Sequence, residues 1–161
     1  MATANHNLSD YDLDAIPDGS SFSIHLVVSQ WNDNITKALC NAAIETLKRH
    51  GVKESNIKIW DVPGSFELIY GAKKAQSFDP DAVIAIGSLI KGETQHFEFV
   101  CQAVSQGIKD LNVVSNVPVI FCVLTDDILQ QAKERSGGKH GNKGTEAAAA
   151  AIQMSKLRAI Q

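Results

Sequence analysis

The chain has 161 residues, of which 44% are apolar and only four are proline, so one compact domain with a buried core is expected. Its formal net charge of −3 gives no general attraction to nucleic acid or to an anionic membrane surface, so we expect neither as a partner. The sequence holds no apolar run of about 18 residues that would span a bilayer, and its first residues lack the pattern of a secretory signal.

The three cysteines, Cys40, Cys101 and Cys122, lie inside apolar patterns, and their spacing matches no zinc motif. An odd number of cysteines in such surroundings favours buried free thiols in a reducing compartment over disulfides or a metal site. We therefore expect a cytoplasmic globular protein without a metal centre.

Residues 1–20 differ from the rest of the chain because they are polar and acidic, with aspartates at positions 10, 12, 14 and 18. Such a segment buries little apolar surface, so it stays loose unless a neighbour orders it. We interpret it as an N-terminal arm that precedes a single domain over residues 21–161.

The first half of this domain shows two strand patterns, each followed by a helix pattern. Residues 22–28 predict a strand, and the helix after it has an apolar face formed by Ile35, Leu39, Ala43 and Leu47. One of residues 32–34 is expected to cap this helix, and Gly51 to end it. Residues 57–62 predict a second strand, and a short helix is expected over residues 66–75.

The second half repeats this alternation. Residues 82–90 form an almost continuous apolar run and predict a buried strand. The helix after it shows the clearest periodicity of the chain, at positions 97, 100, 101, 104, 108 and 111. A fourth strand is predicted over residues 118–124 and a helix from there to about residue 135. A glycine-rich, basic loop over residues 136–144 then precedes an alanine-rich helix over residues 145–160.

This alternation predicts the architecture of the domain. Strands that alternate with helices form a parallel sheet through right-handed crossovers, with helices on both faces. We therefore expect an α/β fold, a three-layer αβα domain around four parallel strands. In such sheets ligands bind outside the carboxyl ends of the strands, so the segments 31–32, 63–65, 92–96 and 125–126 are expected at one functional edge.

Two of these segments have both a structural and a functional interpretation. Trp31 is either a half-buried aromatic that covers the rim of the sheet or a flat platform on which a planar heterocycle stacks. Pro63 and Gly64 are explained by turn chemistry alone. That turn leaves Ser65 and Glu67 available to hydrogen-bond a polyhydroxylated or uracil-like ligand.

His96 is predicted in the first turn of the helix that follows the 82–90 strand, directly after Gly92, Glu93 and Thr94. Helix starts expose unpaired N–H groups and bind anions, and the same dipole disfavours an imidazolium there. A single histidine on a helix is often structural. At this edge it can also shuttle protons beside an anion pocket, as a reaction that expels phosphate requires.

The segment 135–144 combines four glycines with Arg135, Lys139 and Lys143. It is either a solvated connection or a phosphate pocket in which Arg135 forms a two-pronged hydrogen bond. It lacks the lysine followed by serine or threonine of a Walker loop, and no dinucleotide fingerprint follows the first strand. NTP hydrolysis and NAD binding are therefore not expected.

Four motifs stand in order along the chain: Trp-Asn at 31–32, Val-Pro-Gly-Ser-Phe-Glu at 62–67, Gly-Glu-Thr-Gln-His-Phe at 92–97 and Gly-Asn-Lys-Gly at 141–144. With them the chain resembles the 6,7-dimethyl-8-ribityllumazine synthase family from about residue 22 to residue 157. The resemblance implies a flavodoxin-like sheet, which an N-terminal strand from a neighbouring subunit would extend.

The resemblance also implies a reaction without a cofactor. The family condenses 5-amino-6-(D-ribitylamino)uracil with 3,4-dihydroxy-2-butanone 4-phosphate, the penultimate step of riboflavin synthesis. An imine would form first, phosphate would leave by elimination, and ring closure with loss of water would give the lumazine. His96 matches the proton-transfer residue of the family.

The other site residues implied by the resemblance fall into three groups. Contacts to the ribitylaminouracil are implied for Trp31, Ser65, Phe66, Glu67, Ser88, Leu89, Ile90 and Phe121. Contacts to the butanone phosphate are implied for Glu93, Thr94 and Arg135, and charged positions bordering the site for Lys143 and Glu146. At position 31 many members of the family have phenylalanine. The larger tryptophan of this chain is similar to the residue of members that also bind riboflavin. Gln30 stands where many members have arginine.

The family assembles as pentamers or as shells of twelve pentamers, with active sites between neighbours. The uninserted loop over residues 136–144 favours the 60-subunit shell, and riboflavin synthase is a further expected partner. Two alternatives remain: the related riboflavin synthase of the same fold, and a flavin-binding or shell-forming homologue that has lost catalysis. Retention of His96, Arg135 and Lys143 together favours the phosphate-eliminating enzyme.

Overall fold

The computed structural model describes residues 7, 9, 10, 12 and 15–160. Much of the predicted N-terminal arm, including residues 1–6, lies outside the described residues, and so does its expected pairing with a neighbouring sheet. Within the described part of the arm, the hydroxyl of Ser9 accepts a hydrogen bond from the backbone N–H of Asn142 at 2.9 Å.

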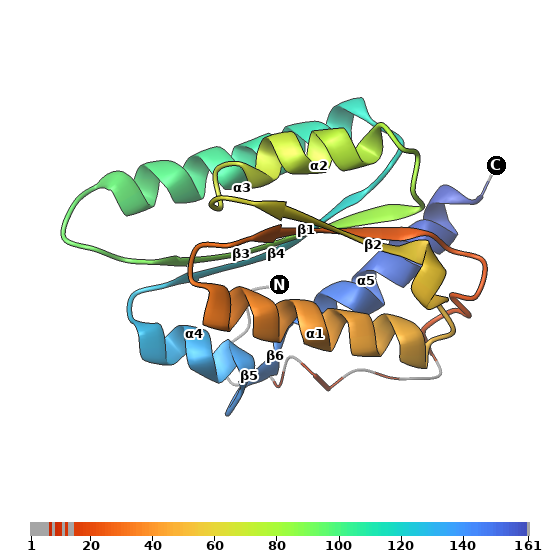
Figure 1. Cartoon of the computed structure of the whole chain (residues 1–161), viewed down its shortest axis with the longest axis horizontal. Helices are drawn as coiled ribbons and strands as arrows, with labels where there is room; N and C mark the ends of the chain where they lie inside the picture. The colour runs from red at the N-terminus through yellow and green to blue at the C-terminus, as the bar shows by residue number, and fades with distance from the viewer. Residues whose placement is uncertain (1–6, 8, 11, 13–14, 161) are drawn as a thin grey trace.

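The four predicted strands form one parallel sheet, which confirms the predicted fold class (Figure 1). The strands β1 (Ile24–Ser29), β2 (Ile57–Val62), β3 (Ala82–Ile90) and β4 (Val119–Asp126) are arranged in the order β2-β1-β3-β4. β1 and β3 lie in the middle and are almost wholly buried, which explains their continuous apolar sequences. β2 lies at an edge, and its side chains are exposed or only partly buried.

Helices cover both faces of this sheet. Figure 1 shows α2 (Leu68–Gln76) and α3 (His96–Val114) on one face, and α1 (Asp33–Arg49), α4 (Leu129–Arg135) and α5 (Lys143–Arg158) on the other. Each face has its own core. On β1, Leu26 belongs to the core beneath α1 and α5 while the next residue, Val27, belongs to the core beneath α2 and α3.

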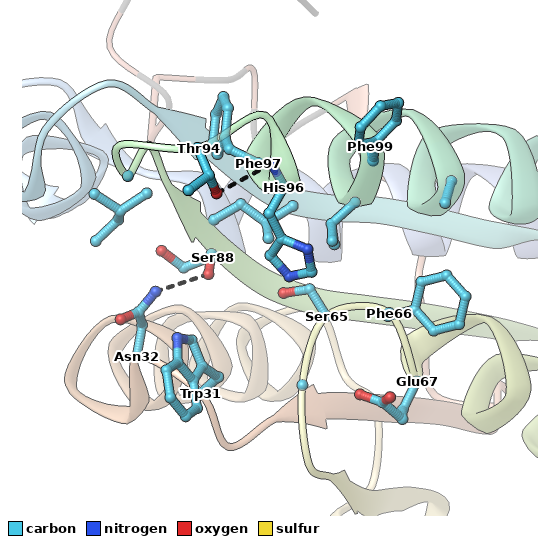
Figure 2. Close-up of a pocket in the computed structure, with 16 residues that line it drawn as sticks. Trp31, Asn32, Ser65, Phe66, Glu67, Ser88, Thr94, His96, Phe97 and Phe99 are labelled. Carbon is cyan, nitrogen blue, oxygen red and sulfur yellow. Dashed lines mark hydrogen bonds between the residues drawn. The ribbon is translucent and has the colours of Figure 1, made fainter.

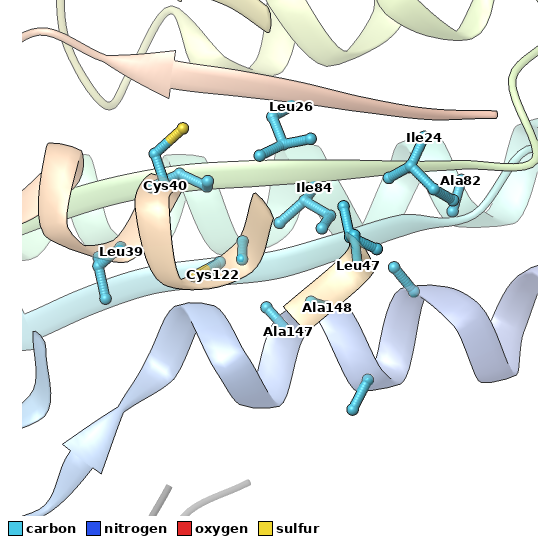
Figure 3. Packing of buried hydrophobic residues seen from close by; sticks show 14 of the residues in the cluster. Ile24, Leu26, Leu39, Cys40, Leu47, Ala82, Ile84, Cys122, Ala147 and Ala148 are labelled. Carbon is cyan, nitrogen blue, oxygen red and sulfur yellow. The ribbon is translucent and has the colours of Figure 1, made fainter. Parts of the chain in front are cut away.

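The α1–α5 side is packed closely because α5 presents small residues to its neighbours. Ala147, Ala148 and Ala151 are buried in the same core cluster as Leu39 and Ile84. Figure 3 shows Ala147 and Ala148 on α5, facing this core. Small side chains let two helix backbones approach one another. The alanine-rich composition of the last helix therefore sets the distance between the two longest elements of this layer.

The bounds of β2 and β3 are those predicted, and the other elements differ from their predicted bounds by a few residues, apart from one segment. Residues 136–144 were predicted as a loop, but they contain two short antiparallel strands, β5 (Ser136–Gly138) and β6 (Gly141–Asn142). α5 begins at Lys143, two residues before the predicted start, because the side chain of Asn142 accepts a hydrogen bond from the Gly144 N–H at 2.8 Å. A short 3₁₀ helix, η2 (Glu54–Asn56), precedes β2.

Two predictions about individual side chains need correction. Asn32 occupies the N-cap position of α1 with φ 57°, yet its side chain does not cap the helix; it donates to the backbone oxygen of Ser88 at 2.9 Å. Of the three cysteines, which are all free thiols, Cys40 and Cys122 are buried as predicted but Cys101 is only partly buried. Among the described helices, none is both long and apolar enough to span a membrane.

Candidate functional site

A pocket of about 890 Å³ lies at the carboxyl edge of the sheet, where sheet topology predicted the functional segments. Its walls come from the ends of β1, β2 and β3 and from the first turns of α3 (Figure 2). The lining residues are Trp31, Asn32, Gly64, Ser65, Phe66, Glu67, Ser88, Leu89, Ile90, Gly92, Thr94, His96, Phe97, Phe99, Val100 and Ala103.

Trp31 forms one wall of this pocket. It follows β1 directly, and 70% of its surface is exposed, so it does not cover the sheet rim as a half-buried aromatic would. The next residue, Asn32, is held in a left-handed conformation by the hydrogen bond from its amide to Ser88. This bond ties the end of β1 to the end of β3 and fixes the backbone that carries the indole. An exposed, well-anchored ring is suited to stacking a planar ligand.

The turn after β2 contributes a second wall. The Ser65 side chain is buried, and its hydroxyl has no hydrogen-bond partner among the described residues. It lies against β3, since a Cβ added to Gly87 would come within 2.8 Å of the Ser65 Oγ. Phe66 and Glu67 are exposed, and Figure 2 shows Ser65 and His96 projecting into the same space. An unpaired buried hydroxyl is available to bind a polar ligand.

The end of β3 forms the floor of the pocket. Ser88 is fully buried, and its hydroxyl also has no partner within the described part of the chain. Leu89 and Ile90 are half-buried and line the pocket beside it. Two unpaired buried hydroxyls, one on the turn after β2 and one on β3, thus lie in an apolar pocket beside an exposed aromatic. An apolar pocket with a few fixed polar groups is typical of small-molecule sites.

The segment between β3 and α3 closes one end of the pocket. Gly92 and Thr94 line it, and the Thr94 hydroxyl accepts a hydrogen bond from the backbone N–H of His96 at 3.4 Å. His96 is the first residue of α3, as the sequence predicted, and its side chain is exposed toward the pocket. Backbone N–H groups and a titratable ring therefore meet at one helix start. Glu93 is exposed and does not line the pocket.

Phe121 and Arg135 do not line the pocket of their own chain. Phe121, in β4, packs against the apolar core beneath α2 and α3. Arg135 ends α4, and its Nε lies 3.7 Å from the Oδ1 of Asp126. Burial raises the pKa of the Asp126 carboxyl, an effect that Arg135 opposes and Asp127 reinforces.

Lys143 and Glu146 also lie apart from the pocket. They form an ion pair of 2.7 Å at the start of α5, where both side chains are largely buried. Cys122 lies close enough for both charges to act on it, but burial dominates and raises the pKa of its thiol to about 12. The pair therefore borders the core rather than the cavity.

Several lining residues were not assigned from the sequence. Phe97, Phe99, Val100 and Ala103 all belong to α3. Phe97 and Val100 were noted only for their helical periodicity, and Phe99, which is 65% exposed, lies outside that periodic set. Asn32 stood in a recognised motif without a role of its own. The described residues contain no group of three or more His, Cys, Asp or Glu side chains that could hold a metal ion.

Comparison with known proteins identifies the family. The profile of the 6,7-dimethyl-8-ribityllumazine synthase family matches residues 21–159. The protein of that name from Flavobacterium psychrophilum is 60% identical over 159 residues, covering 98% of this chain and 84% of the relative. Those from Christiangramia forsetii and Porphyromonas gingivalis are 58% and 54% identical, covering 98% and 99% of this chain and 95% and 100% of the relatives. The chain therefore belongs to the 6,7-dimethyl-8-ribityllumazine synthase family.

Proposed function

We propose that the protein is a transferase of riboflavin biosynthesis. It condenses 5-amino-6-(D-ribitylamino)uracil with 3,4-dihydroxy-2-butanone 4-phosphate to give 6,7-dimethyl-8-ribityllumazine, phosphate and water. The observation that carries this function is the pocket in which Trp31, Ser65 and His96 lie together, in a chain of the lumazine synthase family. The three free thiols support the cytoplasm as its compartment.

The pyrimidine is bound on the Trp31 side of the pocket. The indole stacks on the uracil ring, and the end of β3, from Ser88 to Ile90, supplies polar contacts to its edge. The ribityl chain extends along the turn of Ser65, Phe66 and Glu67, where hydroxyl and carboxylate groups match its own hydroxyls. This arrangement directs the reacting amine toward the start of α3.

His96 moves the protons of the reaction. Imine formation, elimination of phosphate and ring closure each transfer a proton, and the imidazole stands at the pocket end of α3. Glu93, Thr94 and the N–H groups of this helix start lie where the phosphate would be received. Much of the rate enhancement comes from holding both substrates in one pocket.

The phosphate arginine comes from a neighbouring subunit. Arg135, at the end of α4, and Phe121, which is partly buried against the core beneath α2 and α3, do not line the pocket of their own chain, so a second copy completes each site. If each subunit contributes Arg135 to the site of the next, every site is complete only in a closed cyclic assembly. We propose that this assembly is a pentamer and that twelve pentamers form a 60-subunit shell. Lys143 and Glu146 would border the completed site, the arm of residues 1–20 would pair with the open edge of β2, and riboflavin synthase would be a partner of the shell.

The activity is tested by incubating the purified protein with both substrates and following lumazine fluorescence and released phosphate together. Equal formation of both products is expected. His96→Ala should reduce turnover by about 10²- to 10⁴-fold. The matched control is His50→Ala, because His50 follows the last residue of α1, away from the carboxyl edge of the sheet, and does not line the pocket. Folded protein that forms neither product, or full turnover of His96→Ala at every pH, would refute the proposal.

The shared site is tested by subunit complementation. His96→Ala and Arg135→Ala subunits are each expected to be impaired, but co-expressed subunits form mixed rings in which some sites combine an intact His96 with an intact Arg135. Random mixing should restore about a quarter of the wild-type activity. No recovery in rings shown to be mixed would mean that both residues act in the same subunit.

A further inference from the structure

Asp126 is a buried carboxylate at the functional edge of the sheet that the proposed mechanism does not use. It is the last residue of β4, and its side chain is 7% exposed. Its Oδ2 has no hydrogen-bond partner among the described residues. Burying a carboxylate costs free energy unless a cation or hydrogen bonds compensate it. A carboxylate that is buried despite this cost is expected to have a specific role in the structure or the site.

Arg135 provides that compensation. Its Nε lies 3.7 Å from the Oδ1 of Asp126, and among the described residues it has no other ionic partner. This ion pair occupies the Nε edge of the planar guanidinium and leaves the end-on N–H groups of the two terminal nitrogens available to another anion. Those nitrogens form the fork that binds phosphate bidentately.

Asp126 is itself rigidly placed. It pairs with Ile90 across the β3–β4 ladder, and its backbone oxygen accepts a hydrogen bond from the Lys91 N–H at 3.0 Å. Lys91 begins the segment that carries Thr94 and leads to His96. One residue on a rigid strand thus holds both the start of this segment and the arginine at the end of α4.

We propose that Asp126 is the positioning residue of Arg135: its carboxylate holds the guanidinium through Nε so that the two terminal nitrogens face the phosphate of the substrate. This inference rests on the proposed phosphate-binding role of Arg135. The alternative is that Asp126 is only a nearby negative charge. The two roles predict opposite changes in phosphate affinity when the carboxylate is removed. A charge without a positioning role would repel phosphate, so its removal would strengthen phosphate binding, whereas loss of an anchor weakens it.

The test uses Asp126→Asn, which removes the charge and keeps the shape. The matched control is Asp127→Asn, because Asp127 is the adjacent exposed carboxylate and has no ion pair with Arg135. Three quantities are measured on the assembled enzyme: the KM of the phosphorylated ketone, the KM of the pyrimidine, and inhibition by inorganic phosphate. We expect Asp126→Asn to weaken ketone and phosphate binding about 5- to 10-fold and to leave the pyrimidine KM unchanged.

A double variant shows whether Asp126 acts through Arg135. In an Arg135→Ala background, Asp126→Asn should cause no further loss of phosphate affinity, since nothing remains to be positioned. Asp126→Thr, an uncharged residue suited to a strand, repeats the test if the asparagine variant folds poorly. Unchanged or stronger phosphate binding in both variants, or a loss that persists without Arg135, would overturn the inference. If Arg135→Ala alone leaves phosphate affinity intact, the proposed role of Arg135 fails and the positioning role fails with it.

Discussion

Gly144 allows α5 to start directly against α1, and replacing it by alanine tests how closely the two helices are packed. A Cβ built on Gly144 would overlap the carbonyl oxygen of Leu39 and lie 2.8 Å from the carbonyl carbon of the same residue. It would also lie 3.0 Å from the Asn142 Oδ1, which caps α5. Leu39 contributes backbone atoms in the middle of α1, so no side-chain rotation relieves this overlap and one helix has to move.

The size of the effect follows from two opposing contributions. Alanine is favoured over glycine by about 1 kcal/mol inside a helix, and by less in the first turn. Overpacking a well-packed core typically costs about 1 to 3 kcal/mol, and here the clash is with backbone while α5 packs through Ala147, Ala148 and Ile152. We therefore expect Gly144→Ala to lower the free energy of unfolding by about 2 to 3 kcal/mol.

Urea unfolding, followed by tryptophan fluorescence at equal protein concentration, measures this loss. With a typical m-value of about 2 kcal/mol per molar urea, the midpoint should fall by about 1 to 1.5 M. Gly92→Ala is the matched control, because no atom lies within 4 Å of the Cβ it would add. Equal midpoints for the two variants would refute the close approach of α1 and α5.

Three further predictions concern the site, a buried histidine of β1 and the thiols. Trp31→Ala should raise the KM of the pyrimidine about 10-fold in steady-state kinetics, while Trp31→Phe should change it little, because stacking needs an aromatic ring. If both variants changed this KM equally, Trp31 would not be a stacking platform. Burial, with Lys58 nearby, lowers the pKa of His25. The unfolded chain therefore binds a proton that the folded one does not, and stability falls as pH drops below about 6.5 and is flat above it. His25→Phe should reduce this slope in urea unfolding at pH 5 to 8, and His50, whose pKa is also lowered by burial, accounts for a remaining slope of the same sign. A thiol reagent followed by peptide mass spectrometry should modify Cys101 first in folded protein, because burial raises the pKa of Cys122 to about 12; modification of Cys122 first would contradict its burial.

Predictions that depend on local pattern were confirmed. The apolar run over residues 82–90 became the buried strand β3, and the glycine and polar residues after it led into a helix that begins at His96. Predictions that ignored distant partners were incomplete. Asn32 is a good N-cap by residue type, but the backbone oxygen of Ser88, 56 positions away in the sequence, takes its side chain. The glycines of residues 136–142 carry no side-chain pattern, so the pairing of Ser136 with Asn142 could not be foreseen.

The sequence by itself determined the order of strands and helices and therefore which segments meet at the carboxyl edge of the sheet, because these depend on periodicity and on the handedness of crossovers. It also placed Trp31, Ser65 and His96 at that edge. Only the tertiary structure decided that Phe99 lines the pocket while Phe121 is partly buried against the core. Periodicity marks a face as apolar but does not say which neighbour covers it, and Arg135 is kept from its own pocket by the position of α4 and by its ion pair with Asp126.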